Sequence, residues 1–105
     1  MARFDVYRNP TRGAADVPWL LDVQADLLGD LGTRVVIPLR RAERFPDARP
    51  PAELMPVVEV EGSRYVVETP KLAAVPARAL KMPVCSLTDR GADITRALDF
   101  LFQGF

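Results

Sequence analysis

Alternating apolar and polar positions predict β-strands in the first third of the chain. In Arg3–Tyr7 the pattern places Phe4 and Val6 on one face and the polar residues with Tyr7 on the other, which predicts a half-buried strand. A second strand is expected over Trp19–Gln24. The β-branched run of Thr33–Leu39 predicts a central strand, and Pro38 within it predicts a bulge or the strand's end.

The middle of the chain contains the clearest hairpin. Val57–Val60 and Ser63–Glu68 alternate in the same way, and Gly62 between them can supply the positive φ of a tight turn. Before the hairpin, Phe45–Pro56 carries so many prolines that a long loop is expected. After it, two short segments are compatible with strands or with helix: Leu72–Pro76 and Ala79–Met82.

The C-terminal residues have helical periodicity. Thr88 is a plausible N-cap, and an apolar stripe follows at helical spacing. The stripe consists of Ile94, Ala97, Leu98, Leu101, Phe102 and Phe105. Phe100 falls off this stripe, and Gly104 should end the helix. For the stripe a core role is expected, whereas for Phe100, Gln103, Gly104 and Phe105 a core role and a protein contact both stay open.

Several short strands followed by one helix predict a mainly β fold, an antiparallel sheet or small barrel covered by that helix. The length, 105 residues, fits a single domain spanning residues 1–105. Hydrophobic residues at 49% and charged residues at 27% are typical of a folded protein. With neither an apolar run long enough to span a membrane nor a signal-peptide pattern, a cytoplasmic protein is expected.

The charges balance, with 14 basic and 14 acidic residues, so no overall field would attract nucleic acid. A local basic segment comprises Arg40, Arg41, Arg44 and Arg49. We interpret this Arg40–Arg49 segment as a solvated loop, with contact to a phosphate or an acidic peptide as the alternative.

Candidate catalytic groups are few. The chain has no histidine and one cysteine, which excludes histidine triads, histidine metal sites and an internal disulfide, so Cys85 is interpreted as a small buried hydrophobe. No phosphate-binding loop motif occurs, and no cofactor is expected. Two arrangements stay open. Arg34, Thr33 and the Arg40 cluster could grip an RNA phosphate, and carboxylates could pair among Asp22, Asp26, Asp30, Asp89, Asp93 and Asp99.

Six segments, in order along nearly the whole chain, resemble the CcdB family, the toxins of bacterial toxin–antitoxin pairs that poison DNA gyrase. They are Phe4–Tyr7, Asp22–Leu28, Arg34–Leu39, Leu54–Val58, Leu72–Pro76 and Asp93–Phe105. The resemblance implies an SH3-like antiparallel barrel with a small accessory sheet and a C-terminal helix. It also implies a homodimer whose C-terminal tails bind the dimerisation domain of the gyrase A subunit, a CcdA-like antitoxin as second partner, and no chemistry by the toxin itself.

Carried over by position, the family's gyrase contacts fall on Leu27, Leu28, Asp99, Gln103, Gly104 and Phe105. Gln103 stands where the family has a tryptophan, Phe105 where it has isoleucine, and Asp99 where it has an amide. Loss of a large aromatic anchor commonly costs about 2 kcal/mol of binding or more. Two alternatives follow: a homologue with a changed target that no longer inhibits gyrase, and an endoribonuclease like the MazF and Kid toxins, which share the barrel.

Overall fold

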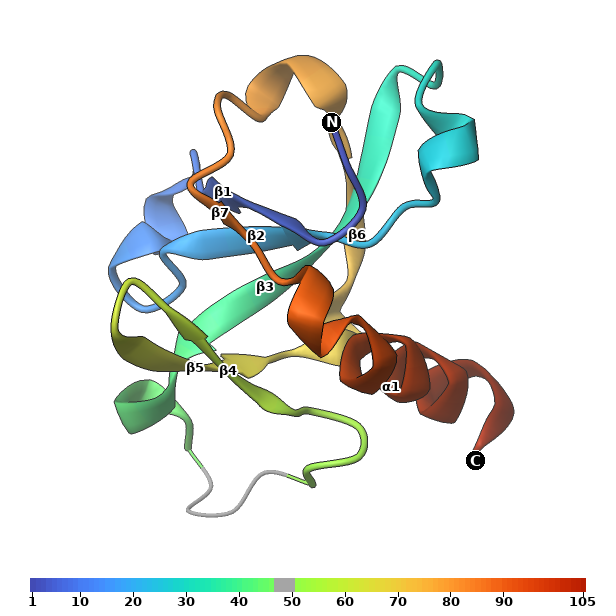
Figure 1. The fold of residues 1–105 in the computed structure, drawn as a ribbon. Helices are drawn as coiled ribbons and strands as arrows, with labels where there is room; N and C mark the ends of the chain where they lie inside the picture. The colour runs from blue at the N-terminus through green and yellow to red at the C-terminus, as the bar shows by residue number, and fades with distance from the viewer. Residues whose placement is uncertain (47–50) are drawn as a thin grey trace.

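The structure, a computed structural model, describes residues 1–46 and 51–105. An antiparallel, nearly closed barrel of six strands forms the body of the molecule, in the order β4-β5-β3-β2-β1-β7 (Figure 1). A further strand, β6, pairs only with the first half of β3, so the small accessory sheet implied by the resemblance is a single extra strand in the described residues. The strands are β1 (Asp5–Arg8), β2 (Trp19–Asp22), β3 (Thr33–Arg41), β4 (Val57–Val60), β5 (Ser63–Val67), β6 (Ala73–Pro76) and β7 (Cys85–Ser86).

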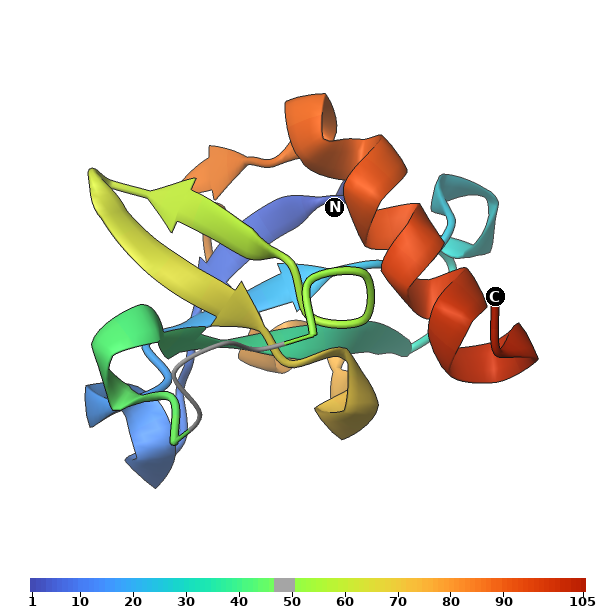
Figure 2. The ribbon, with the colours of Figure 1, turned by 90° about the horizontal axis from the view of Figure 1, so that it is seen from below.

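One α-helix, α1 (Gly91–Gln103), lies across the barrel, as Figure 2 shows. The predicted fold class, a mainly β barrel with a C-terminal helix, is confirmed. Short 3-10 turns connect the strands: η1 (Arg12–Ala15), η2 (Asp26–Leu28), η3 (Ala42–Arg44), η4 (Thr69–Lys71), η5 (Ala77–Ala79) and η6 (Thr88–Arg90).

In β1 the neighbouring residues Val6 and Tyr7, which point to opposite faces, are both buried, so the prediction that Tyr7 lies on a solvent-facing side of this strand is wrong. Val6 lies in the main core inside the barrel, together with Leu21, Ile37 and Ile94 of α1. Tyr7, on the opposite face of β1, lies in a second apolar cluster with Leu20, Val36 and Leu80. The segment after β6 supplies Leu80, and its position over that face could not be predicted from the alternation alone.

Pro38 neither ends β3 nor interrupts its pairing with β2, contrary to the prediction. The strand continues to Arg41, and Pro38 lies opposite Leu20 in regular register. Its carbonyl accepts a hydrogen bond from the Glu68 amide, so the side of Pro38 that lacks an amide proton is the side that faces β5 and β6. At this point along β3 the pairing partner on that side changes from β6 to β5. No strand requires a donor at that point, and the proline is therefore tolerated.

The predicted hairpin is confirmed as β4 and β5. Both connecting residues have positive φ, 51° for Glu61 and 82° for Gly62, as in a type I′ turn. Only the glycine was predicted from the sequence. In the uncertain region that follows, Ala73–Pro76 forms β6, whereas Ala79–Met82 forms neither a strand nor a helix beyond the end of η5.

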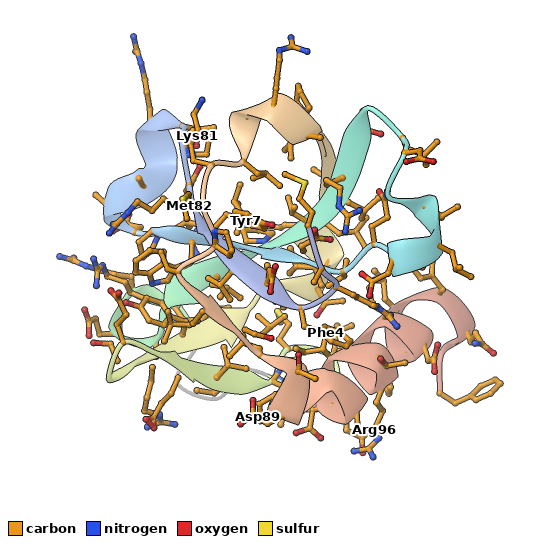
Figure 3. All side chains as sticks on the ribbon, turned by 45° about the horizontal axis from the view of Figure 1, so that its top comes forward. Phe4, Tyr7, Lys81, Met82, Asp89 and Arg96 are labelled. Atoms are coloured by element: carbon orange, nitrogen blue, oxygen red, sulfur yellow. The ribbon has the colours of Figure 1, made fainter. Side chains whose placement is uncertain are left out.

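The helix begins later than predicted. Thr88 starts η6, its hydroxyl contacts Ser86 Oγ at 2.6 Å, and Arg90 precedes α1 without a side-chain cap. The prediction that Thr88 caps the helix is therefore wrong. Gly91 fits this start because a β-carbon there would lie 2.8 Å from the Phe4 ring, which Figure 3 shows beside α1.

Candidate functional site

The first two turns of α1 are anchored in the main core, and its end projects beyond it. Ile94 and Ala97 are fully buried, and Leu98 packs against the main core. Phe102 and Phe105, predicted to share this packed stripe, are instead 72% and 82% exposed. The periodicity is helical throughout, but in the last turn Leu101 is only partly buried and the side chains of Phe102 and Phe105 extend past the barrel. The expectation of a core role is wrong for Phe102, and of the two roles left open for Phe105 the core role is wrong.

Gly104 ends the helix as predicted. Its φ of 83° is left-handed, and its amide donates to the carbonyl of Phe100 at 2.9 Å. Phe100 itself, off the stripe, is half-buried. The chain therefore turns away from the helix axis at Gly104, and the exposed Gln103 and Phe105 lie on either side of that turn.

A second apolar feature lies on the same side of the barrel. The η2 turn presents Leu27, which is 97% exposed, and Leu28, which is half exposed. In Figure 1 this turn lies at the upper right of the barrel, the side toward which the C-terminal part of α1 extends below it. Leu27 and Leu28 come five and six residues after Asp22, which ends the buried strand β2, and they belong to the η2 turn rather than to the strand.

An apolar groove of about 480 Å³ connects the η2 turn with the end of α1. Leu28 and Leu31 line one side of it, and Leu98 and Phe102 line the other, over a floor that includes Val35. We call this groove, together with Leu27 and residues 99–105, the tail surface. Exposed apolar surface of this kind marks a contact site for another macromolecule.

The structure thus brings together part of the predicted site. Leu28 and the helix that carries Asp99, Gln103, Gly104 and Phe105 border one surface, and Leu27 stands exposed beside it. Asp99 is exposed on α1. Sequence reasoning missed Leu31 and the role of Phe102 as a groove wall, because Gly29–Gly32 looked like a simple break and the helical spacing of Phe102 looked like core.

The arginine proposed for phosphate binding is not available at the surface. Arg34 is 0% exposed, and its Nη2 lies 2.7 Å from Oδ2 of the equally buried Asp22. A guanidinium held in this way cannot contact an RNA backbone, so the predicted arginine site for RNA cleavage is wrong. Arg34 lies on the same face of β3 as the buried Val36, and Val35 between them points to the opposite face.

The candidate carboxylates occupy different environments. Within residues 1–46 and 51–105, no three potential metal-binding side chains gather. Burial raises the pKa of Asp22, and the hydrogen bond from Arg34 opposes this rise. Asp22 therefore serves an internal ion pair, whereas Asp89, Asp93 and Asp99 lie along η6 and α1.

The Arg40–Arg49 segment is not a loop over its first two residues, contrary to the prediction. Arg40 and Arg41 end β3, where Arg40 Nε lies 2.9 Å from Glu68 Oε1 and Arg41 Nε donates to the Ala15 carbonyl. Arg44 lies in η3 and forms a longer contact with Asp16. Arg49 lies outside the described residues.

Cys85 lies in β7, a short strand that the sequence analysis missed. The side chain is partly buried and packs against the main core, so its interpretation as a small hydrophobe holds for its contacts. Burial raises the pKa of its thiol, and the negative charges of Glu61, Asp5 and Asp89 add to the rise. The thiol is therefore poorly suited to act as a nucleophile at neutral pH.

These observations define a small antiparallel barrel that presents an exposed apolar surface at one end, which is the form of a protein-binding domain. The sequence matches the family model described as CcdB protein over residues 3–104. The chain therefore belongs to the CcdB family, the toxins of toxin–antitoxin systems that act on DNA gyrase. Among the residues that the structure describes, no helix is long and apolar enough to cross a membrane.

Proposed function

We propose that this chain is a gyrase poison that binds the dimerisation domain of the gyrase A subunit through the tail surface. The observation that carries the proposal is the exposure of Phe102 and Phe105 at 72% and 82% in a chain of this family. Large aromatic side chains are typical anchors of protein interfaces, and leaving two of them in water without a partner is unfavourable.

The geometry of the helix end supports this assignment. Ile94 and Ala97 anchor α1 in the core, and the exposed last turn continues the same helix to Gln103. A contact surface that is already ordered loses little conformational entropy on binding. The αL turn at Gly104 then directs Phe105 away from the helix axis.

Leu27 and Leu28 extend the same surface. Leu28 lines the groove that Phe102 borders, so one partner can contact both elements at once. Asp99 adds a negative charge to the exposed side of the helix, which favours a partner with a basic side chain opposite it.

The proposal includes a homodimer and a CcdA-like antitoxin that neutralises the toxin. A second copy would bring two C-terminal tails into one site, which enlarges a contact area that is small for a single tail. The antitoxin would bind as an extended or folding segment, a mode in which a disordered chain covers a large surface. The chain itself would carry out no chemistry.

Gln103 favours a second candidate, a homologue of this family with a changed target. The residue is exposed next to Phe102 and presents an amide where a large aromatic anchor would contribute more binding energy. Phe105 supplies an aromatic ring two residues later. Whether that ring restores gyrase binding is the question that separates the two candidates.

The test is calorimetric titration of the protein into the purified dimerisation domain of the gyrase A subunit. Phe105→Ala and Gly104→Glu should each weaken binding by about tenfold or more. The matched control is Met82→Ala, which removes an equally exposed side chain on another side of the barrel, as Figure 3 shows, and should bind like the parent. A folded parent protein that does not bind would support the changed target instead.

A further inference from the structure

The η2 turn has no buried residue of its own, yet it presents the apolar side chains of the tail surface. Leu27 and Leu28 both face outward, and Gly29 and Gly32 follow within a few residues. Apolar packing therefore cannot hold this turn in place, and glycine-containing segments are flexible unless other contacts fix them. The contacts that order the turn must be polar.

Gln24 makes those contacts. Its Nε2 donates to the carbonyl of Leu28 at 2.9 Å, across the turn, and its Oε1 accepts from the amide of Val35 in β3 at 3.1 Å. The side chain is buried and so holds these bonds away from competing water. One amide group thus ties the end of η2 to a central strand of the barrel.

The buried ion pair fixes Gln24 in turn. Asp22 Oδ1 accepts a hydrogen bond from the backbone amide of Gln24 at 3.0 Å. Arg34 Nη2 donates to the backbone carbonyl of Gln24 at 3.4 Å and also pairs with Asp22. Arg34 Nη1 has no hydrogen-bond partner among the described residues. A buried ion pair with an unsatisfied donor contributes less stability than apolar packing would. We therefore interpret the Asp22–Arg34 pair as a device that fixes the position of Gln24.

We propose that Gln24 is a positioning residue that, held by the Asp22–Arg34 pair, fixes the η2 turn so that Leu27 and Leu28 are presented to the partner at the tail surface. The inference rests on the proposed function, since it assumes that these leucines contact gyrase. A second hydrogen bond holds the start of the turn, where the backbone amide of Arg3 donates to Asp26 Oδ1 at 2.7 Å. The turn is therefore held from both ends.

Gln24→Met tests this, because it keeps the side-chain size while it removes both amide contacts. Amide hydrogen exchange at residues 28–31 should accelerate by about tenfold or more, since the amides of Leu28, Gly29 and Leu31 are held only by local turn bonds. Amides of the main core should change much less. If Gln24→Met does not fold, Gln24→Glu replaces it, because the carboxylate can still accept from Val35 but cannot donate to Leu28.

The matched control is Asn9→Ala, which removes another amide tether, from Asn9 Nδ2 to the Val17 carbonyl at 2.7 Å, beside η1 at the other side of the barrel. It should leave exchange at residues 28–31 unchanged. Equal acceleration in this control would show a general loss of stability and overturn the proposal. Unchanged exchange at residues 28–31 in the Gln24 variant would overturn it as well.

A double-mutant cycle then connects the turn to binding. Leu28→Ala should weaken binding to the gyrase A dimerisation domain by about fivefold in the parent and by much less in Gln24→Met, because the leucine is no longer held in place. Fully additive effects would overturn the positioning role. If the parent protein does not bind at all, the proposed function fails, and the exchange experiment alone decides whether Gln24 orders the turn.

Discussion

The fold shifts the ionisation of the Tyr7 phenol. The side chain is buried in the second apolar cluster beneath Leu80. Burial raises the pKa of its phenol, the negative charges of Asp5 and Asp22 raise it further, and the positive charge of Arg34 opposes them. The folded protein therefore retains the phenolic proton at a pH where the unfolded chain releases it.

In Tyr7→Phe the free energy of unfolding should consequently decrease less at high pH than in the parent. Above about pH 10 the unfolded chain binds fewer protons than the folded one, so the free energy of unfolding of the parent decreases as the pH rises. Phenylalanine has no proton to lose. Urea unfolding at about pH 8 and about pH 11 measures the difference, in a Cys85→Ala background because the thiol pKa is also raised. An equal decline in both proteins would contradict this account.

At the scale of elements, the turn of the β4–β5 hairpin holds Glu61 in a backbone conformation that does not suit this residue type. Glu61 adopts a φ of 51°, a left-handed conformation that costs an ordinary L-residue about 1–2 kcal/mol. Gly62 follows at 82° without such a cost. The hairpin forms because the pairing of Val58 with Tyr65 and of Val60 with Ser63 outweighs the strain.

Glu61→Asn should stabilise the protein by about 0.5–1 kcal/mol, because Asn-Gly is a preferred sequence for the type I′ turn. Chemical unfolding at neutral pH measures the gain. Glu61→Ala is the matched control, since it removes the same carboxylate without any preference for positive φ. If alanine stabilises as much as asparagine, the charge rather than the turn geometry is responsible.

At the scale of the whole molecule, most large exposed apolar side chains gather at one end. Leu27, Leu28, Leu31, Phe102 and Phe105 all lie on or beside the tail surface. A barrel of this size buries a limited core, so additional burial at this end would add appreciably to its stability. The proposed homodimer would cover part of this surface where the two tails meet and leave the rest for the gyrase contact.

The unfolding midpoint should therefore rise with protein concentration, because association favours the folded state. Thermal unfolding over roughly a hundredfold range of concentration measures this shift, and sedimentation reports the mass directly. Phe102→Ser should reduce the concentration dependence, whereas Met82→Ser, at a distant exposed position, should not. A midpoint independent of concentration, with a monomeric mass throughout, would contradict the homodimer.

The sequence by itself determined β1 to β5, with their hairpin, the C-terminal helix and the end of that helix at Gly104, but it missed β7 and left β6 open. These features depend on local rules: alternation, helical spacing, and the freedom of glycine to adopt positive φ. The order of the segments also determined the family. Local patterns were sufficient because each of these features involves residues close together in the chain.

The tertiary structure alone decided which apolar and charged residues are buried. Arg34 looked like a phosphate ligand until the barrel placed it beside Asp22, and Phe102 looked like core until the helix extended past the barrel. Pro38 was harmless because β3 changes neighbours at that point. Burial depends on what lies opposite a side chain in space, and the residues opposite come from distant parts of the sequence, so no local pattern contains that information.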